Sequence, residues 1–118
     1  MLRISPDWQL ITNLIGKPYA FPSYPPKSFD CFTITVYLRE LLFNLPTPHV
    51  TLSVDEAKVD YEELEKPEEG CIVSMTDKHI GVYINGRVIT ALEKRGVCAL
   101  HWKTANAIYR VRCWEVKA

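Results

Sequence analysis

The sequence lacks the apolar stretches that direct a chain into or across a membrane. Residues 1–20 contain no uninterrupted apolar run of about 7 to 15 residues and no small-residue cleavage site, so they do not form a secretory signal. No segment approaches the roughly 20 apolar residues of a transmembrane helix. We therefore expect no signal peptide, no membrane partner and synthesis in the cytoplasm.

Cysteine is scarce and never closely spaced. The four cysteines show no CxxC pattern and lie in unrelated local contexts: Cys31, Cys71, Cys98 and Cys113. This spacing disfavours both a zinc site and a dense disulfide framework. We expect free thiols, no metal and no cofactor.

An excess of charge of either sign is also missing, because 14 Lys and Arg balance 14 Asp and Glu. Proteins that bind nucleic acid normally carry a basic excess, so nucleic acid is not an expected partner. The charges are nevertheless segregated. Residues 55–77 hold nine acids against two bases, and residues 78–118 hold eight bases against two acids. A solvated acidic helix surface is the commoner interpretation of such a run.

The length and composition fit one packed domain over residues 1–118. The 47% hydrophobic and 24% charged residues are typical of soluble globular proteins. A chain of 118 residues matches the size of a single domain. No segment is repeated or of low complexity.

The first half of the sequence predicts helices. Residues 5–7, Ser-Pro-Asp, are a helix start, and Gly16 with Pro18 ends the helix. Its apolar face comprises Trp8, Ile11, Leu14 and Ile15. Residues 17–29 contain four prolines and are expected to form a loop.

A second helix is predicted from about Cys31 to Phe43, capped by Asp30 and ended at Asn44. Its core-facing residues recur at spacings of three and four: Cys31, Ile34, Leu38 and Leu41. Ser53 and Glu56 form a capping box that predicts a third, acidic helix ending before Pro67.

The second half changes to the period of strands. Five strands are predicted, at residues 71–75, 79–84, 87–92, 97–102 and 109–116. Asn85-Gly86 between two of them is a strong signal for a two-residue hairpin turn. Helices followed by an antiparallel sheet define the α+β class.

Cys31 is the first candidate for chemistry. A thiol at a helix N-terminus lies at the positive end of the helix dipole, which lowers its pKa, and the free N–H groups of the first turn can bind an oxyanion. The alternative is an inert buried cysteine, since cysteine is among the most buried residue types.

Only three histidines could serve as a base. His49 lies in a proline-rich loop and is expected at the surface, whereas His79 opens a strand. The hairpin turn pairs residues whose numbers sum to 171, which places His79 diagonal to Thr90 on one face. The next turn pairs His101 with Val88, about 13 Å along the sheet from His79, so His101 is too far away to orient it.

Four segments in this order resemble the NlpC/P60 family of papain-like cysteine peptidases: GKPYA at 16–20, FDC at 29–31, EEGCIVSM at 68–75 and KHIGVYINGRVITA at 78–91. Tyr19 precedes Cys31 by twelve residues, as in the family pattern. The resemblance implies that Cys31 is the nucleophile, that His79 is the general base and acid, and that Tyr19 places a hydroxyl beside the oxyanion site.

The chain departs from the family pattern at several positions. Thr90 aligns with the family's second histidine; its hydroxyl can accept a hydrogen bond but supplies neither a ring nor a charge. Phe32-Thr33 replaces a Ser-Gly pair, Pro22-Ser23 replaces Gly-Gly, and Cys71 replaces an aspartate. These changes alter the floor of the expected substrate cleft.

The resemblance implies a papain-like domain with N-terminal helices packed on a five-stranded, mainly antiparallel sheet. It further implies hydrolysis of amide bonds in peptidoglycan stem peptides. EKRGV at 93–97 and the closing YRVRCWEV are similar to small peptidase-like proteins of bacteriophage tails and prophages, which makes tail proteins and the virion candidate surroundings. Two alternatives remain open: a tail assembly protein that keeps the fold, and a hydrolase acting on a protein glutamine or a lipid.

Overall fold

Helices precede strands along most of the chain. The structure, a computed structural model, describes residues 8–48, 54–76 and 79–117. Within these residues it contains four α-helices and six β-strands, in the order α1 (Trp8–Leu14), α2 (Cys31–Phe43), α3 (Val54–Asp60), β1 (Tyr61–Leu64), β2 (Ile72–Met75), β3 (His79–Ile84), β4 (Arg87–Leu92), β5 (Gly96–His101), α4 (Trp102–Tyr109) and β6 (Arg112–Val116). The α+β class expected from the sequence is confirmed.

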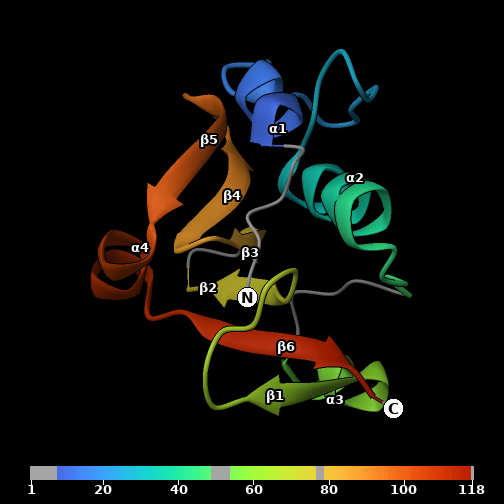
Figure 1. The fold of residues 1–118 in the computed structure, drawn as a ribbon, viewed down its shortest axis with the longest axis vertical. Helices are drawn as coiled ribbons and strands as arrows, with labels where there is room; N and C mark the ends of the chain where they lie inside the picture. The colour runs from blue at the N-terminus through green and yellow to red at the C-terminus, as the bar shows by residue number, and fades with distance from the viewer. Residues whose placement is uncertain (1–7, 49–53, 77–78, 118) are drawn as a thin grey trace.

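The strands form one antiparallel sheet in the order β1-β6-β2-β3-β4-β5 (Figure 1). The C-terminal strand β6 lies between β1 and β2. The described part of the sheet therefore has six strands, and the expected number of five is wrong.

The additional strand is β1, in the segment expected to be an acidic helix up to residue 66. The helix α3 ends at Asp60, and the next four residues pair with β6 in the register Tyr61↔Val116. Tyr61 is buried and donates its hydroxyl to the Pro48 carbonyl at 2.8 Å. Tertiary pairing thus overrides the helical propensity of the glutamates. The expected capping residue Ser53 lies outside the described residues, as does the expected helix start at 5–7.

Residues 102–109 form a second element that the sequence did not predict. The sequence predicts strands at 97–102 and 109–116 with a connection between them, but residues 102–109 form the helix α4. His101 caps it, because its Nδ1 accepts from the Lys103 N–H at 3.2 Å. The register between β4 and β5 also differs by one residue from the expected pairing of His101 with Val88. Val88 pairs with Leu100, and His101 pairs with Arg87.

The first two helices largely match expectation. Ile11 and Leu14 of α1 are buried, whereas Ile15 lies beyond its end and is 43% exposed. The bounds and the cap of α2 are confirmed, but Leu41 is 54% exposed and does not face the core. Arg39 occupies the buried face in its place.

Two apolar clusters lie on opposite faces of the sheet. On the face of α2, Ile34 packs with Ile89 and Ala91 of β4. On the face of α4, Ala105 packs with Val88. Figure 1 shows α2 and α4 on opposite sides of the sheet. Because side chains alternate along a strand, Thr90 belongs to the face of Val88.

Arg39 connects α2 to the C-terminal strand. Its side chain is 0% exposed and forms a bidentate ion pair with Glu115 of β6, with a shortest distance of 2.7 Å. The guanidinium also donates to the Gly70 carbonyl at 2.7 Å and to the Pro46 carbonyl at 2.9 Å, while Nε donates to the Thr47 hydroxyl at 3.0 Å. The buried charge is therefore fully hydrogen-bonded.

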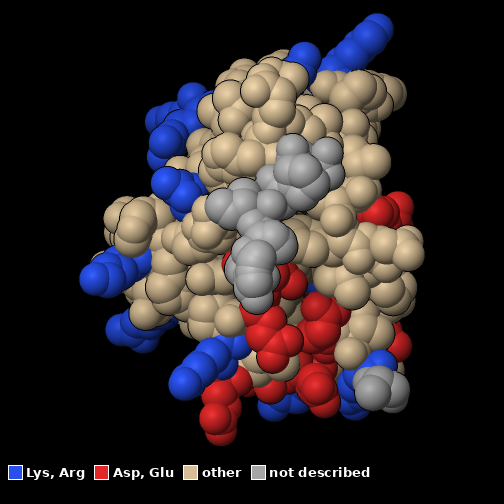
Figure 2. All heavy atoms as spheres, in the orientation of Figure 1, with Lys and Arg blue, Asp and Glu red and all other residues tan. Residues whose placement is uncertain are grey.

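The charge segregation of the sequence is visible on the surface. Figure 2 shows Asp and Glu gathered over the lower part of the molecule, where β1 and α3 lie, and Lys and Arg to the left and top. Asp55, Glu56, Glu62 and Glu65 are exposed there. Over the described residues, no helix has the length and apolar character needed to span a membrane.

Candidate functional site

The candidate site begins at the capped start of α2. The extended backbone of Asp30 ends the preceding loop, and its Oδ1 accepts from the N–H groups of Phe32 and Thr33, both at 2.9 Å. The Thr33 hydroxyl in turn accepts from the Asp30 N–H at 2.9 Å. This reciprocal capping box fixes Cys31 as the first helical residue, as the sequence predicted.

The Cys31 side chain lies between α2 and the sheet. It is 5% exposed and packs in an apolar cluster with Ile72, Ile80 and Trp114. The backbone N–H groups of Ile80, Cys31 and Phe32 favour the thiolate and act to lower the pKa of Cys31.

The pKa of Cys31 is raised, which corrects the expectation of a lowered one. Burial is the largest cause, and the nearby Asp30 carboxylate adds to it. The backbone donors act in the opposite direction but do not outweigh burial. The N–H groups at the helix start therefore act to lower the pKa of Cys31, as expected, but desolvation raises this pKa by more.

His79 opens β3 and pairs with Met75 of β2. Its side chain is half-buried, and its Nδ1 is a buried atom with no hydrogen-bond partner among the described residues. The ring nitrogen therefore does not bond the Cys31 sulfur in this structure. His79 is nevertheless the residue directly before Ile80, whose N–H acts to lower the pKa of Cys31.

Thr90 is completely buried, and its hydroxyl donates to the Ile80 carbonyl at 2.7 Å. The expected hairpin register is confirmed by Val82↔Ile89 and the two pairs that follow it toward the turn. The ladder between β3 and β4 ends at Val82, and the Thr90 hydroxyl replaces the strand partner of the Ile80 carbonyl. The Thr90 hydroxyl thus holds backbone, and no bond joins it to Nδ1 of His79.

Tyr19 reaches the site through an isolated parallel bridge with Phe29. The Phe29 N–H donates to the Pro18 carbonyl, and the Ala20 N–H donates to the Phe29 carbonyl, both at 3.1 Å. The pKa of Tyr19 is raised by burial first and then by the negative charge of a Cys31 thiolate. Tyr19 thus lies near enough to Cys31 for the charge of a thiolate to act on the phenol.

Ser23 is a contributor that sequence reasoning missed. Its hydroxyl donates to Asp30 Oδ2 at 3.1 Å and lies 2.8 Å from the Thr33 hydroxyl. It thereby fastens the proline-rich loop to the start of α2. Phe21 and Tyr24 on this loop are 74% and 69% exposed. The pattern carried no signal for this contact, because Ser23 stands where the family has glycine.

His101 is exposed and caps α4, so it does not contribute to the site. His49, the third histidine, lies outside the described residues. No group of three or more His, Cys, Asp or Glu side chains in the described ranges could hold a metal ion.

No protein-family model and no curated protein matches the chain. The candidate site therefore stands on its own geometry: Cys31, at the capped start of α2, packs against Ile80, the residue that follows His79 and whose carbonyl accepts from Thr90. That arrangement contains a thiol, a partly buried imidazole and several backbone donors, which are the groups needed for covalent acyl transfer.

The raised pKa of Cys31 leads to a testable pH dependence. A raised pKa keeps the thiol protonated at neutral pH, so alkylation by iodoacetamide should be slow there and accelerate only above the ordinary thiol pKa of 9.0. Peptide mapping of the alkylated protein against pH measures this. Cys98, whose pKa burial also raises, is the matched control and should behave similarly. Fast labelling of Cys31 alone at neutral pH would instead show an ion pair with His79.

Thr90→Val should destabilise the protein by about 1–3 kcal/mol, because it leaves the buried Ile80 carbonyl without a donor. Urea unfolding measures the change in the free energy of unfolding. Thr90→Ser keeps the hydroxyl and is the control that should lose less. If Thr90→Val loses no stability, the hydrogen bond to the Ile80 carbonyl does not contribute.

Proposed function

We propose that the chain is a papain-like cysteine hydrolase of the NlpC/P60 type, acting on amide bonds of peptidoglycan stem peptides. The observation that carries the proposal is the position of Cys31. It is the first residue of α2 behind a reciprocal capping box, and it packs against Ile80 of β3, the residue directly after His79. A merely structural cysteine does not require this assembly.

The reaction would start with transfer of the Cys31 proton to His79. The thiolate attacks the carbonyl carbon of the amide, and His79 then donates the proton to the leaving amine. The Cys31 N–H and the Tyr19 hydroxyl would stabilise the oxyanion, because the N–H groups of Phe32 and Thr33 already donate to Asp30. Water releases the acyl group from Cys31 with His79 acting again as base. Nδ1 of His79 has no hydrogen-bond partner among the described residues, so it would be the atom that accepts the thiol proton once the ring turns toward Cys31.

The raised pKa of Cys31 is compatible with this sequence of steps. In the resting site the thiol is neutral, because burial disfavours an isolated thiolate. Proton transfer to His79 creates an imidazolium next to the thiolate, and opposite charges offset the cost of burial. The nucleophile would therefore be active mainly when substrate and ring are both in place.

The substrate rests on the family resemblance. Within stem peptides the expected bond joins D-Glu to the diamino acid. The similarity of EKRGV and YRVRCWEV to phage tail and prophage proteins favours an origin of that kind. A protein glutamine or a lipid ester would undergo the same acyl transfer at Cys31. Assays with each substrate class distinguish these possibilities.

A second candidate is a tail assembly protein that keeps the fold without the activity. Two observations favour it: His79 forms no hydrogen bond with the Cys31 sulfur, and Thr90 is fully used by the backbone. An orienting group for the imidazole is thus missing among the described residues, and losing such a group can reduce the rate by up to ~10⁴.

The deciding experiment is the release of new amines from purified stem-peptide fragments. We expect slow release that is stopped by prior alkylation of Cys31. Protein kept over days without releasing amine, but incorporated into phage tails, would establish the structural role instead.

A further inference from the structure

Two cysteines outside the candidate site lie next to each other in the sheet. The register of β2 with β6 pairs Val73 with Cys113. Cys71 is two residues before Val73, so it is the diagonal neighbour of Cys113 on the same face. Both belong to the apolar cluster beneath α4, and both are free thiols.

The two thiols lie near enough to affect each other's ionisation. Their interaction raises the pKa of Cys71 and lowers the pKa of Cys113. Cys71 is the more deeply buried of the two, and desolvation also raises its pKa. The pair therefore divides into a proton-holding thiol and a thiol that ionises more easily.

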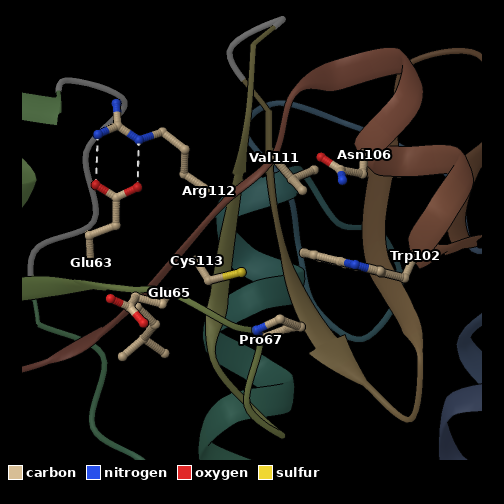
Figure 3. A pocket seen from close by; sticks show the side chains of 9 residues that line it. Glu63, Glu65, Pro67, Trp102, Asn106, Val111, Arg112 and Cys113 are labelled. Carbon is tan, nitrogen blue, oxygen red and sulfur yellow. Dashed lines mark hydrogen bonds and ion pairs between the residues drawn. The ribbon is translucent and has the colours of Figure 1, made fainter.

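Only one of the two sulfurs is accessible from outside. Cys113 lines a groove of about 550 Å³ together with Glu65, Pro67 and Trp102, whereas Cys71 does not. Figure 3 shows the Cys113 sulfur pointing toward the side of Trp102, and an ion pair between Arg112 and Glu63 on the wall of the groove. A small solute can reach Cys113 through the groove, with Cys71 directly behind it.

We propose that Cys113 and Cys71 form a peroxide-reactive dithiol that closes to an intramolecular disulfide. The Cys113 thiolate attacks one oxygen of hydrogen peroxide and the O–O bond breaks. Hydroxide leaves, and Cys113 becomes a sulfenic acid. Cys71 loses its proton and attacks the sulfenyl sulfur, and the S–O bond breaks to release water. Two thiols are oxidised by two electrons and one peroxide is reduced to two waters.

Closure requires a small movement of the backbone. Diagonal neighbours lie about 7–8 Å apart, at the upper limit of about 7 Å between Cα atoms for a disulfide. Cys71 precedes β2, and its carbonyl accepts from the Tyr83 N–H of β3 at 3.0 Å, so the closure also shifts this hydrogen bond. This inference is independent of the proposed hydrolase activity.

The test is oxidation of the purified protein with stoichiometric hydrogen peroxide, followed by non-reducing peptide mapping. We expect one cross-linked peptide joining Cys71 to Cys113, lighter by two hydrogens and restored by dithiothreitol. Cys113→Ser should lose the cross-link, and Cys71→Ser should leave a sulfenic acid on Cys113 that dimedone traps. Cys98→Ser, in the same cluster, should leave the cross-link unchanged.

The wild-type map decides the question even if a variant fails to fold. Oxidation of Cys31 or Cys98 at an equal or greater rate, with no Cys71–Cys113 peptide, would overturn the proposal. So would over-oxidation of Cys113 to the sulfinic acid without any disulfide.

Discussion

Cys31→Ala is expected to abolish amide hydrolysis while the protein stays folded. Removing the nucleophile of a covalent mechanism reduces kcat by on the order of 10⁶ in well-studied hydrolases, because no other group replaces it. The change removes only one sulfur from an apolar cluster, so the fold should remain. Amine release from stem-peptide fragments measures the activity, and circular dichroism verifies the fold.

Cys98→Ala is the matched control, because Cys98 is equally buried at 4% exposure against 5% for Cys31. It lies on the face of α4 and should retain full activity. His79→Ala should lose activity together with Cys31→Ala, and the double variant should be no slower than either single variant. Activity that survives Cys31→Ala would place the nucleophile elsewhere.

Replacing Arg39 by Ala should destabilise the protein by about 3–5 kcal/mol. The substitution leaves Glu115 without its counter-ion and removes the donors to the Gly70 and Pro46 carbonyls. A buried group that loses its partner bears the full cost of desolvation. Urea unfolding at neutral pH measures the loss, and the protein can fail to fold at body temperature.

Arg112→Ala supplies the comparison, because Arg112 forms an ion pair of the same type and the same 2.7 Å distance with Glu63. Its side chain is 43% exposed, so the pair is screened by solvent and the expected loss is at most about 1 kcal/mol. Equal losses for the two variants would show that burial does not determine the strength of the Arg39 pair.

Local signals predicted the parts of the fold that depend on nearby residues. The Asp30 cap, the bounds of α2 and the Asn85-Gly86 hairpin all follow from contacts within a few residues. The placement of Tyr19 beside Cys31 followed from the family resemblance. These features required no knowledge of distant segments.

The parts that were missed depend on distant segments. The glutamates of β1 favour a helix when only nearby residues are considered. They form a strand because β6, at residues 112–116, pairs with them. The backbone N–H of Ile80 acts to lower the pKa of Cys31. Every residue except proline carries such a group, so the sequence cannot show which one lies near the thiol. The raised pKa of Cys31 follows from packing against β2 and β6, which helix-start reasoning does not include.

The position of β6 has a consequence for how the chain folds during synthesis. Until Val116 leaves the ribosome, β1 has no strand partner and one edge of β2 is open. Such unpaired edges bind other strands and favour aggregation. Truncations that remove the last few residues should therefore yield insoluble protein and not a smaller folded unit. Arg39 would also lack its counter-ion, because Glu115 belongs to β6.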